Sequence, residues 1–223
     1  RSFSVENATA LDAALMEVDA VLHCAGPFVL TFRQMAEACI RTKRHYVDIS
    51  GEIEGFEALA AMSEEAHHAG VMLLPGGGFD VVPSDCLIAY TAGKLTSATH
   101  LELYIKSIGS GVSRGTARSG IENSHRQGRI RRDGKIIGVP NVWGTKDVDF
   151  GRGASRLISM GWGDVSTAYH STGIPNVTVY MSFPKAMVNM MRLTRYAGPI
   201  LYTRIARDFI KWLIGKFFTP GPT

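Results

Sequence analysis

Three short apolar segments recur at a regular interval in the first third of the chain. Asp19–Cys24, His45–Ile49 and Gly70–Leu74 each have the composition of a buried strand, and their last residues lie 25 positions apart. Each segment runs into a glycine-containing turn and then into a helical pattern, which is typical of a βα repeat. Right-handed crossovers make such strands parallel, with their carboxyl ends at one edge of the sheet. We therefore predict a parallel sheet that binds ligands at this edge.

The turns at this edge carry the candidate binding residues. They are Ala25-Gly26-Pro27, Ser50-Gly51-Glu52 and Gly76-Gly77-Gly78-Phe79-Asp80. Three consecutive glycines cost backbone entropy, so they need a reason such as close contact with a ligand or with another backbone segment. Asp80 is the best single candidate for a polar cleft residue. The alternative is that Asp80 and Asp85 cap the following helix, which is the role we favour for Asp85.

Ordinary structural roles are also open at the first two turns. Gly26 with Pro27 suits close packing against a nicotinamide ring or ribose, but the pair also suits a simple βα turn. Asp48 ends the second segment, and a carboxylate buried there needs a partner. Ser50 or Glu52 would cap the next helix if their role is structural.

The remaining patterns predict a mixed second half. Helical spacing predicts helices at 8–17, Thr31–Thr42, Ile53–Ala69 with Gly70 as its cap, and a helix that starts at Pro83-Ser84-Asp85. We expect the strand before Cys24 to be covered by helices on both faces. Alternating apolar and polar residues then predict strands at Leu101–Ile105 and Val177–Met181, with a hairpin at Arg132-Asp133-Gly134-Lys135 and a basic helix at Ser113–Gln127.

These patterns define a fold class and three regions. We predict an α/β chain in which the C-terminal half of a Rossmann-type parallel sheet is followed by a second α+β domain with a mixed or antiparallel sheet. The regions are a partial NAD(P)-binding domain at 1–95, a substrate or dimerisation domain at 96–184 and a basic amphipathic helical tail at 185–223. Arg114, in the basic helix, either holds a substrate anion or belongs to a solvated, ion-paired face.

Composition limits the classes of protein. With 45% hydrophobic and 20% charged residues the chain reads as globular, and its three cysteines lack metal-like spacing, which favours a reducing intracellular compartment and no metal site. From Lys185 onward the local charge is +6, so 185–218 either packs on its own domain or docks on a membrane surface or partner. We expect no spanning helix, no signal peptide and no nucleic-acid partner.

Several motifs together resemble one protein family. They are His23-Cys24-Ala25-Gly26-Pro27-Phe28, His45–Glu52, Gly78–Asp85, Ser113-Arg114-Gly115-Thr116 and Tyr169–Val177. Their order and spacing resemble those of the saccharopine dehydrogenase-like oxidoreductases, a group that includes the trans-acting enoyl reductases. The resemblance spans nearly the whole chain.

The resemblance implies an activity and a set of site residues. Members of the family transfer hydride between NAD or NADP and a carbon acceptor, here a small-molecule or lipid-linked substrate, and often form homodimers. Carried over by motif, the cofactor-binding residues are Ala25, Gly26, Pro27, Ser50 and Gly51. The substrate-binding residues are Gly78, Phe79, Asp80 and Arg114, and no general acid is assigned.

One part of the family pattern is expected outside this chain. The opening strand, glycine-rich turn and helix that hold the pyrophosphate in the family should precede Arg1, so we expect the 223-residue chain alone to bind NAD(P)H weakly or not at all. The alternative function is a non-catalytic scaffold or accessory subunit that keeps the fold without the cofactor-binding half, with its basic tail docked on a larger assembly or membrane.

Overall fold

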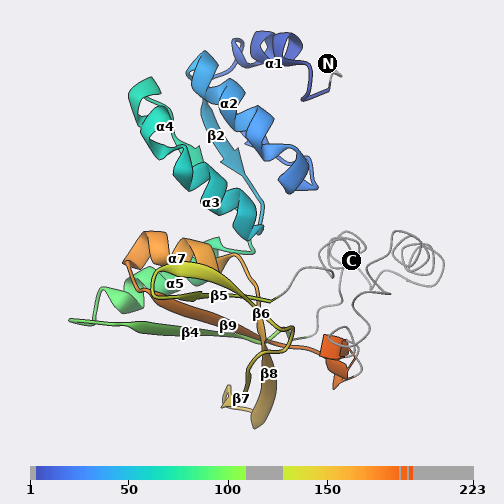
Figure 1. The fold of residues 1–223 in the computed structure, drawn as a ribbon, viewed down its shortest axis with the longest axis vertical. Helices are drawn as coiled ribbons and strands as arrows, with labels where there is room; N and C mark the ends of the chain where they lie inside the picture. Colours follow the sequence, from blue (N-terminus) through green and yellow to red (C-terminus); the bar gives the residue numbers. More distant parts are fainter. Residues whose placement is uncertain (1–3, 109–127, 186, 190, 193–223) are drawn as a thin grey trace, which may run out of the picture. The chain divides into compact units, whose positions relative to one another are not determined.

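The computed structural model describes residues 4–108, 128–185, 187–189 and 191–192. The chain divides into two compact units, which are treated separately below (Figure 1). The first unit comprises Arg1–His100 with Trp162–Pro175, and the second comprises Leu101–Gly161 with Asn176–Thr223. The sequence-based division placed all of 96–184 in one domain, whereas the segment Trp162–Pro175 belongs to the first unit.

The first unit contains the predicted parallel sheet. Its strands are β1 (Ala20–His23), β2 (His45–Asp48) and β3 (Leu73–Leu74), in the order β1-β2-β3. Both strand pairs are parallel, with Val21 opposite Tyr46 and Tyr46 opposite Leu73. The strands are shorter than their apolar segments, because the chain turns at the glycine-containing ends. The predicted βα arrangement is confirmed.

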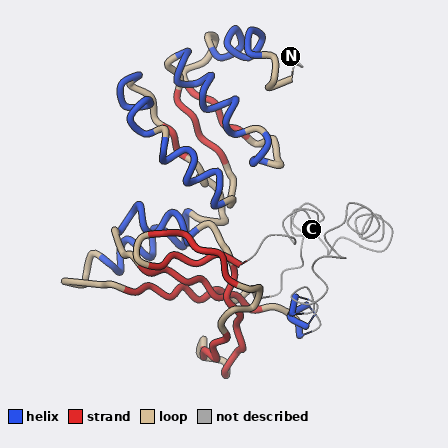
Figure 2. Tube along the Cα trace, in the orientation of Figure 1, coloured by secondary structure: helices blue, strands red, loops and turns tan. Residues whose placement is uncertain are grey.

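Helices alternate with these strands along the chain, as the periodicity predicts (Figures 1 and 2). They are α1 (Ala8–Leu15), the 3-10 helix η1 (Phe28–Leu30), α2 (Phe32–Thr42), α3 (Ile53–Ala61), α4 (Ser63–Ala69) and α5 (Val82–Ala92). The single helix predicted at Ile53–Ala69 is wrong, because Met62, at φ −90° and ψ 6°, leaves the helical conformation between α3 and α4. Gly70 does end α4 in the left-handed conformation, as predicted.

A hydrophobic core joins α1, α2 and the sheet. Its fully buried members include Leu11 of α1, Cys39 of α2 and Tyr46 of β2. Burial in this core raises the pKa of the Cys39 thiol to about 12, so the thiol stays protonated. Burying side chains of this size stabilises a fold by roughly 1.5–3 kcal/mol each. The core is therefore the main source of stability for the parallel layer.

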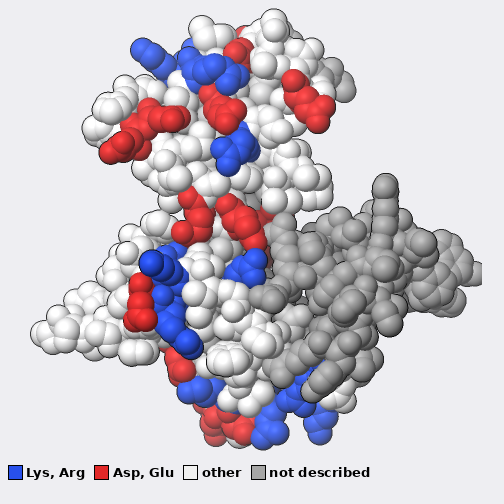
Figure 3. All heavy atoms as spheres, in the orientation of Figure 1, with Lys and Arg blue, Asp and Glu red and all other residues white. Residues whose placement is uncertain are grey.

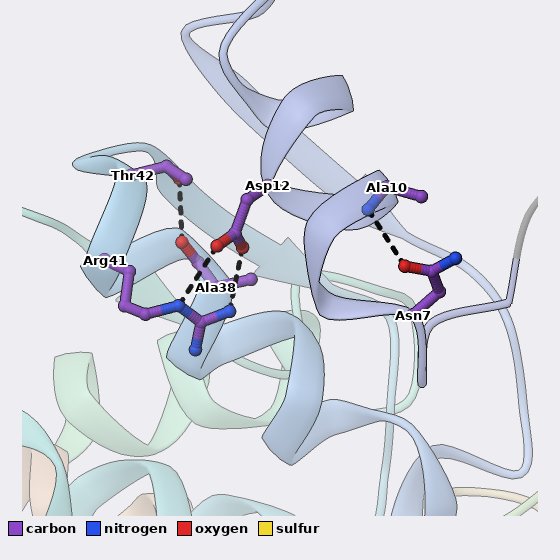
Figure 4. A network of polar contacts seen from close by, with 6 residues as sticks. All are labelled: Asn7, Ala10, Asp12, Ala38, Arg41 and Thr42. Atoms are coloured by element: carbon purple, nitrogen blue, oxygen red, sulfur yellow. Dashed lines mark hydrogen bonds and ion pairs between the residues drawn. The ribbon is translucent and has the colours of Figure 1, made fainter.

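Polar contacts fix α1 against α2 at the surface (Figure 4). Asn7 caps α1, since its Oδ1 accepts a hydrogen bond from the Ala10 amide at 3.1 Å. The Arg41 guanidinium donates to both carboxylate oxygens of Asp12, at 2.8 and 3.3 Å. Basic and acidic side chains are similarly interspersed over the face seen in Figure 3. Exposed pairs of this kind contribute up to about 1 kcal/mol each.

One face of the parallel sheet is open in the described residues. Leu22 of β1 is 61% exposed and Leu74 of β3 is 46% exposed. The prediction that helices cover the strands on both faces is therefore wrong for the described part of the chain. Val18, which follows α1, is also exposed, at 44%.

A helix from the second half of the sequence completes the first unit. This helix, α7 (Asp164–Thr172), packs against α5 and α3 (Figure 1). Ser166 Oγ donates a hydrogen bond to Glu57 Oε1 at 2.5 Å, and Ser171 Oγ donates to Asp85 Oδ1 at 3.0 Å. These bonds attach α7 to both helices, so a segment predicted to lie in the second domain reaches the neighbourhood of the predicted site.

The second unit is built on one six-stranded sheet. Its strands are β4 (His100–Ile105), β5 (Gly128–Arg132), β6 (Lys135–Val139), β7 (Thr145–Asp149), β8 (Ala154–Met160) and β9 (Asn176–Ser182). The order is β6-β5-β9-β8-β7, and β4 also pairs with β9. Asp133 and Gly134, at φ 49° and 76°, form the predicted hairpin turn between β5 and β6. The predicted second region with an antiparallel sheet is confirmed, whereas α7, from the same half of the sequence, belongs to the first unit.

Several predicted features lie outside the described residues. They are the basic helix at Ser113–Gln127 with Arg114 and most of the basic tail at 185–218. Among the helices that are described, none combines the length and apolar character needed to cross a bilayer.

Candidate cofactor and substrate site at the carboxyl edge of the parallel sheet

The turn after β1 is open to solvent. Residues 24–27 are exposed. The Thr31 hydroxyl holds the turn in place by donating a hydrogen bond from Oγ1 to Ala25 O at 2.9 Å. A Cβ atom added to Gly26 would come no closer than 3.5 Å to its nearest neighbour, the Phe28 ring. This is an ordinary contact, so packing within the protein does not require glycine here. Because the turn is also exposed, another molecule can approach its backbone from solvent.

His23 supports this turn from the end of β1. Its side chain is buried, and its Nε2 lies 2.8 Å from Thr31 Oγ1. Because the Thr31 hydroxyl gives its hydrogen to Ala25 O, His23 Nε2 is the donor in this bond. Burial lowers the pKa of His23, and nearby Asp48 opposes that effect. A neutral imidazole with its proton on Nε2 fits both observations.

Asp48 organises the turn after β2. Its carboxylate is fully buried and accepts hydrogen bonds from Tyr46 OH at 2.6 Å, Ser50 N at 2.9 Å, Ser50 Oγ at 2.8 Å and Gly76 N at 2.8 Å. Burial raises the pKa of Tyr46, and the bond to Asp48 adds to that rise, so the phenol remains a donor. Four hydrogen bonds thus provide the partners that a buried carboxylate needs. Asp48 is a structural residue.

The glycine run after β3 packs against the end of β2. Gly76 has φ +71°, and a Cβ atom there would lie 2.9 Å from Cζ of Phe56. Gly77 donates from its amide to Asp48 O at 2.6 Å, and a Cβ atom on it would lie 3.2 Å from that same oxygen. The reason for these glycines is therefore close contact with neighbouring protein, the second of the two explanations considered for the run.

Direct bonds hold the three turns together as one surface, which we call the carboxyl-edge site (24–27, 49–52 and 75–80). The Val29 amide, just after the first turn, donates to Glu52 Oε2 in the second at 2.6 Å. The second and third turns meet through Gly77 and Asp48, as described above. Ser50 is buried and bonded to Asp48, so its side chain supports the site from within. Neither Ser50 nor Glu52 caps α3 with its side chain.

Asp80 stands beside Gly51 on this surface. Its Oδ2 would lie only 3.2 Å from a Cβ atom on Gly51. The side chain is accessible, yet partial burial raises the pKa of its carboxyl group. Asp80 does not cap α5, which begins after Val81 without a side-chain cap. The structure therefore brings together the two predicted residues Gly51 and Asp80.

The other predicted residues of the third turn differ in exposure. Phe79 is 89% exposed. Gly78 instead packs closely against the residue after β2, because a Cβ atom on it would lie 3.1 Å from Cβ of Ile49. Arg114 lies outside the described residues. The capping role favoured for Asp85 is wrong, because Asp85 lies inside α5 and accepts from Ser171 instead.

The sequence reasoning missed the segment before α7. Trp162 Nε1 donates to Asp80 O at 2.9 Å, and a Cβ atom on Gly163 would lie 2.8 Å from the Phe56 ring. Asp164, the first residue of α7, is fully buried. The only local signal was the pattern Gly-Trp-Gly-Asp between a strand and a helix, which does not reveal where that helix packs.

The geometry can be compared with known proteins. Residues 1–74 match a family model described as the saccharopine dehydrogenase NADP binding domain. A human saccharopine dehydrogenase-like oxidoreductase is 28% identical over 144 residues, which is 62% of this chain and 33% of the relative. The chain is therefore similar in sequence to the saccharopine dehydrogenase-like oxidoreductases, with the family-model match confined to residues 1–74.

A second relative shows a similar level of identity, and one solved structure shows a similar fold. A probable mitochondrial saccharopine dehydrogenase-like oxidoreductase of Arabidopsis thaliana is 27% identical over 134 residues, covering 56% of this chain and 30% of the relative. The fold resembles that of apo saccharopine dehydrogenase (L-Glu forming) from Saccharomyces cerevisiae, with a TM-score of 0.58, 16% identity and coverage of 89% of this chain and 47% of that one. The chain spans about a third of the length of the curated relatives that it matches.

The family's dinucleotide cofactor fits part of the carboxyl-edge site. The β1 turn is exposed, and a Cβ atom on Gly26 would make only an ordinary contact with the Phe28 ring, at 3.5 Å. Such an opening suits the close approach of a flat ring or a ribose. By contrast, the Ser50 side chain is buried and donates a hydrogen bond to the Asp48 carboxylate. Within the described residues, no group of three metal-ligating side chains is arranged to hold a metal ion.

Proposed function

We propose that this chain is the cofactor-edge and substrate portion of an NAD(P)-dependent oxidoreductase, with hydride transfer between NAD(P)H and a small-molecule substrate as the reaction. The observation that carries the proposal is the junction of three exposed or half-exposed turns at the carboxyl ends of β1, β2 and β3. Ligands of open α/β sheets bind at this edge. The similarity to the saccharopine dehydrogenase-like oxidoreductases supports the same chemistry.

Each turn has a separate task in this proposal. Bound at this edge, the cofactor supplies the hydride. The open backbone of Gly26 and Pro27 supports the ring, and the bond from Val29 to Glu52 keeps the first turn in register with the second. Asp80, beside Gly51, faces the substrate side and supplies or accepts the proton that accompanies hydride transfer.

Replacement of Asp80 by asparagine tests this role. In the full-length protein we expect Asp80→Asn to lower turnover about 10²-fold or more, as removal of a general acid does, while the melting temperature changes by only a few degrees. NAD(P)H oxidation would be followed across a panel of carbonyl, imine and enoyl substrates. Asp19→Asn, an exposed acid near the opposite end of β1, is the control.

Two results would count against this assignment. Unchanged turnover in well-folded Asp80→Asn would remove Asp80 from the site. If the wild-type full-length protein neither binds NAD(P)H nor oxidises it with any substrate, the alternative function of a non-catalytic scaffold would take the place of the enzyme.

A further inference from the structure

The side chain of Thr31 does not act as a threonine at the start of a helix usually does. Thr31 is the N-cap residue of α2, a position where a threonine hydroxyl commonly accepts a hydrogen bond from an amide of the first helical turn. In the described structure its side chain forms no such bond. The hydroxyl is directed back along the chain, where it donates to Ala25 O at 2.9 Å. The helix therefore lacks a stabilising cap, and the turn after β1 is held instead.

His23 determines the direction of this hydrogen bond. Its Nε2 lies 2.8 Å from Thr31 Oγ1. The carbonyl oxygens of Pro27 and Phe28 also lie near the hydroxyl, each at 3.5 Å, so other acceptors are close by. An N–H donor at Nε2 uses the acceptor side of Oγ1 and leaves the hydroxyl hydrogen for Ala25 O, the closest of the three carbonyl oxygens. An unprotonated Nε2 would accept that hydrogen itself, and Ala25 O would be released.

Aromatic rings on two sides hold the imidazole of His23 in place. The Phe28 ring meets it edge to face, with the ring centroids 5.5 Å apart, and the Tyr46 ring lies tilted to it at 6.1 Å. His23 is only 3% exposed. Burial lowers the pKa of His23 more than nearby Asp48 raises it, so the ring is neutral and carries one proton near pH 7. The nitrogen that carries this proton decides which way the hydrogen bond to Thr31 runs.

The bond to Ala25 O fixes the orientation of one peptide unit in the exposed turn. The peptide bond between Ala25 and Gly26 is trans, and the carbonyl and N–H groups of a trans peptide point in opposite directions. With Ala25 O held toward Thr31, the Gly26 N–H points to the other side of the turn. Gly26 is exposed, and its amide has no hydrogen-bond partner in the described part of the chain. The turn therefore presents a free backbone donor, next to Pro27, which has none.

We propose that Thr31 and His23 are positioning residues of the carboxyl-edge site, which direct the Gly26 N–H outward as a donor for an acceptor oxygen of the bound dinucleotide. The inference rests on the proposed function, because it requires a dinucleotide at the turn after β1. The nicotinamide half of the cofactor offers two acceptors of this kind, the carboxamide oxygen and the hydroxyl oxygens of its ribose. A hydrogen bond to either one would orient the ring beside Gly26 and Pro27.

The tautomer of His23 tests the direction of these bonds without reference to activity. Nitrogen-15 NMR of the histidine side chains, in the full-length protein near neutral pH, distinguishes a ring nitrogen that carries a proton from one that does not. We expect Nε2 of His23 to carry the proton. A proton on Nδ1 alone would mean that Thr31 donates to His23 and leaves Ala25 O free, and the proposal would be overturned.

NADPH binding by variants of Thr31 tests the positioning role. Thr31→Val keeps the branched shape but removes the hydroxyl, so Ala25 O is no longer held. We expect its affinity for NADPH to fall about 3- to 10-fold, the effect of one hydrogen bond, and Thr31→Ser, which keeps the hydroxyl, to bind within about twofold of wild type. Melting curves would establish that each variant is folded at the temperature of the measurement.

Thr42→Val is the matched control for this series. Thr42 lies in the same helix as the residue that Thr31 caps, and its Oγ1 also donates to a backbone carbonyl oxygen, that of Ala38, at 2.7 Å (Figure 4). The substitution removes the same kind of bond near the opposite end of α2. We expect Thr42→Val to bind NADPH as tightly as wild type.

The Gly26 amide gives a direct readout of the proposed contact. When NADPH is added to the full-length protein, the resonance of this amide should shift and its hydrogen should exchange more slowly with solvent, and both changes should be smaller in Thr31→Val. Titration with 2′-phospho-ADP-ribose, which lacks the nicotinamide, identifies the acceptor. A response to this ligand assigns the ribose, and a response to NADPH alone assigns the carboxamide.

The failure of this inference can be told apart from failure of the proposed function. If NADPH binds but the Gly26 amide does not respond, or if Thr31→Val binds NADPH as tightly as wild type, the positioning role is overturned and the proposed function stands. If the wild-type protein does not bind NADPH, the proposed function fails and the positioning role fails with it.

Discussion

Replacement of Asp48 by alanine should destabilise the first unit by about 3–5 kcal/mol, the range expected when one partner of a buried polar network is removed. The substitution leaves four donors without their acceptor, namely Tyr46 OH, the Ser50 amide and hydroxyl, and the Gly76 amide. None of these groups can turn to water without opening the junction of the second and third turns. Urea denaturation followed by circular dichroism measures the change.

The control for this prediction is an acid of similar size in an exposed pair. Asp12→Ala removes the surface contact with Arg41 and should cost about 1 kcal/mol or less. If Asp48→Ala loses no more stability than Asp12→Ala, Asp48 does not organise the carboxyl-edge site. Cooperative unfolding of the whole first unit in Asp48→Ala would agree with the proposed role of Asp48 in organising the carboxyl-edge site.

Replacement of Gly76 by alanine should cost about 2–5 kcal/mol. The positive φ of +71° accounts for about 1–2 kcal/mol of this, because a Cβ atom is unfavourable in the left-handed conformation. Overpacking against Cζ of Phe56, which the new Cβ atom would meet at 2.9 Å, adds roughly 1–3 kcal/mol.

Gly70 offers a matched control that separates the conformational cost from the cost of overpacking. Its φ of +69° is nearly the same, and a Cβ atom there would meet nothing within 4 Å. Gly70→Ala should therefore show the conformational cost alone. Equal losses in the two variants would mean that Phe56 moves aside and that the glycine run is not fixed by packing against it.

Local patterns in the sequence predict those parts of the fold that local chemistry decides. The apolar segments and their turns identify the parallel strands, and the Asp133-Gly134 pair identifies a hairpin because both residues tolerate positive φ. The break between α3 and α4 was missed, since the apolar spacing continues unchanged through Met62.

Contacts between distant segments could not be predicted in the same way. A triple glycine shows that something approaches the backbone, but the sequence alone does not say whether this is a ligand, Phe56 or the carbonyl of Asp48. Asp164 looks like an ordinary acid in the first turn of a helix, a position that the helix dipole favours. Only the packing of α7 against α5 and α3 shows that this acid is buried.

The most direct test of the proposed cofactor edge is NADPH binding by the full-length protein and by variants that carry progressively larger side chains at position 26. Gly26→Ala adds a Cβ atom that meets only ordinary contacts within the protein, so it should fold, and a melting curve checks that Gly26→Val folds as well. Gly55→Ala, in α3 and with similar room for a Cβ atom, is the control. Titration calorimetry should show affinity falling from glycine to alanine to valine at position 26, by tenfold or more for valine, and unchanged affinity in Gly55→Ala. Equal affinity in wild type and in folded Gly26→Val would contradict the placement of the cofactor at this turn.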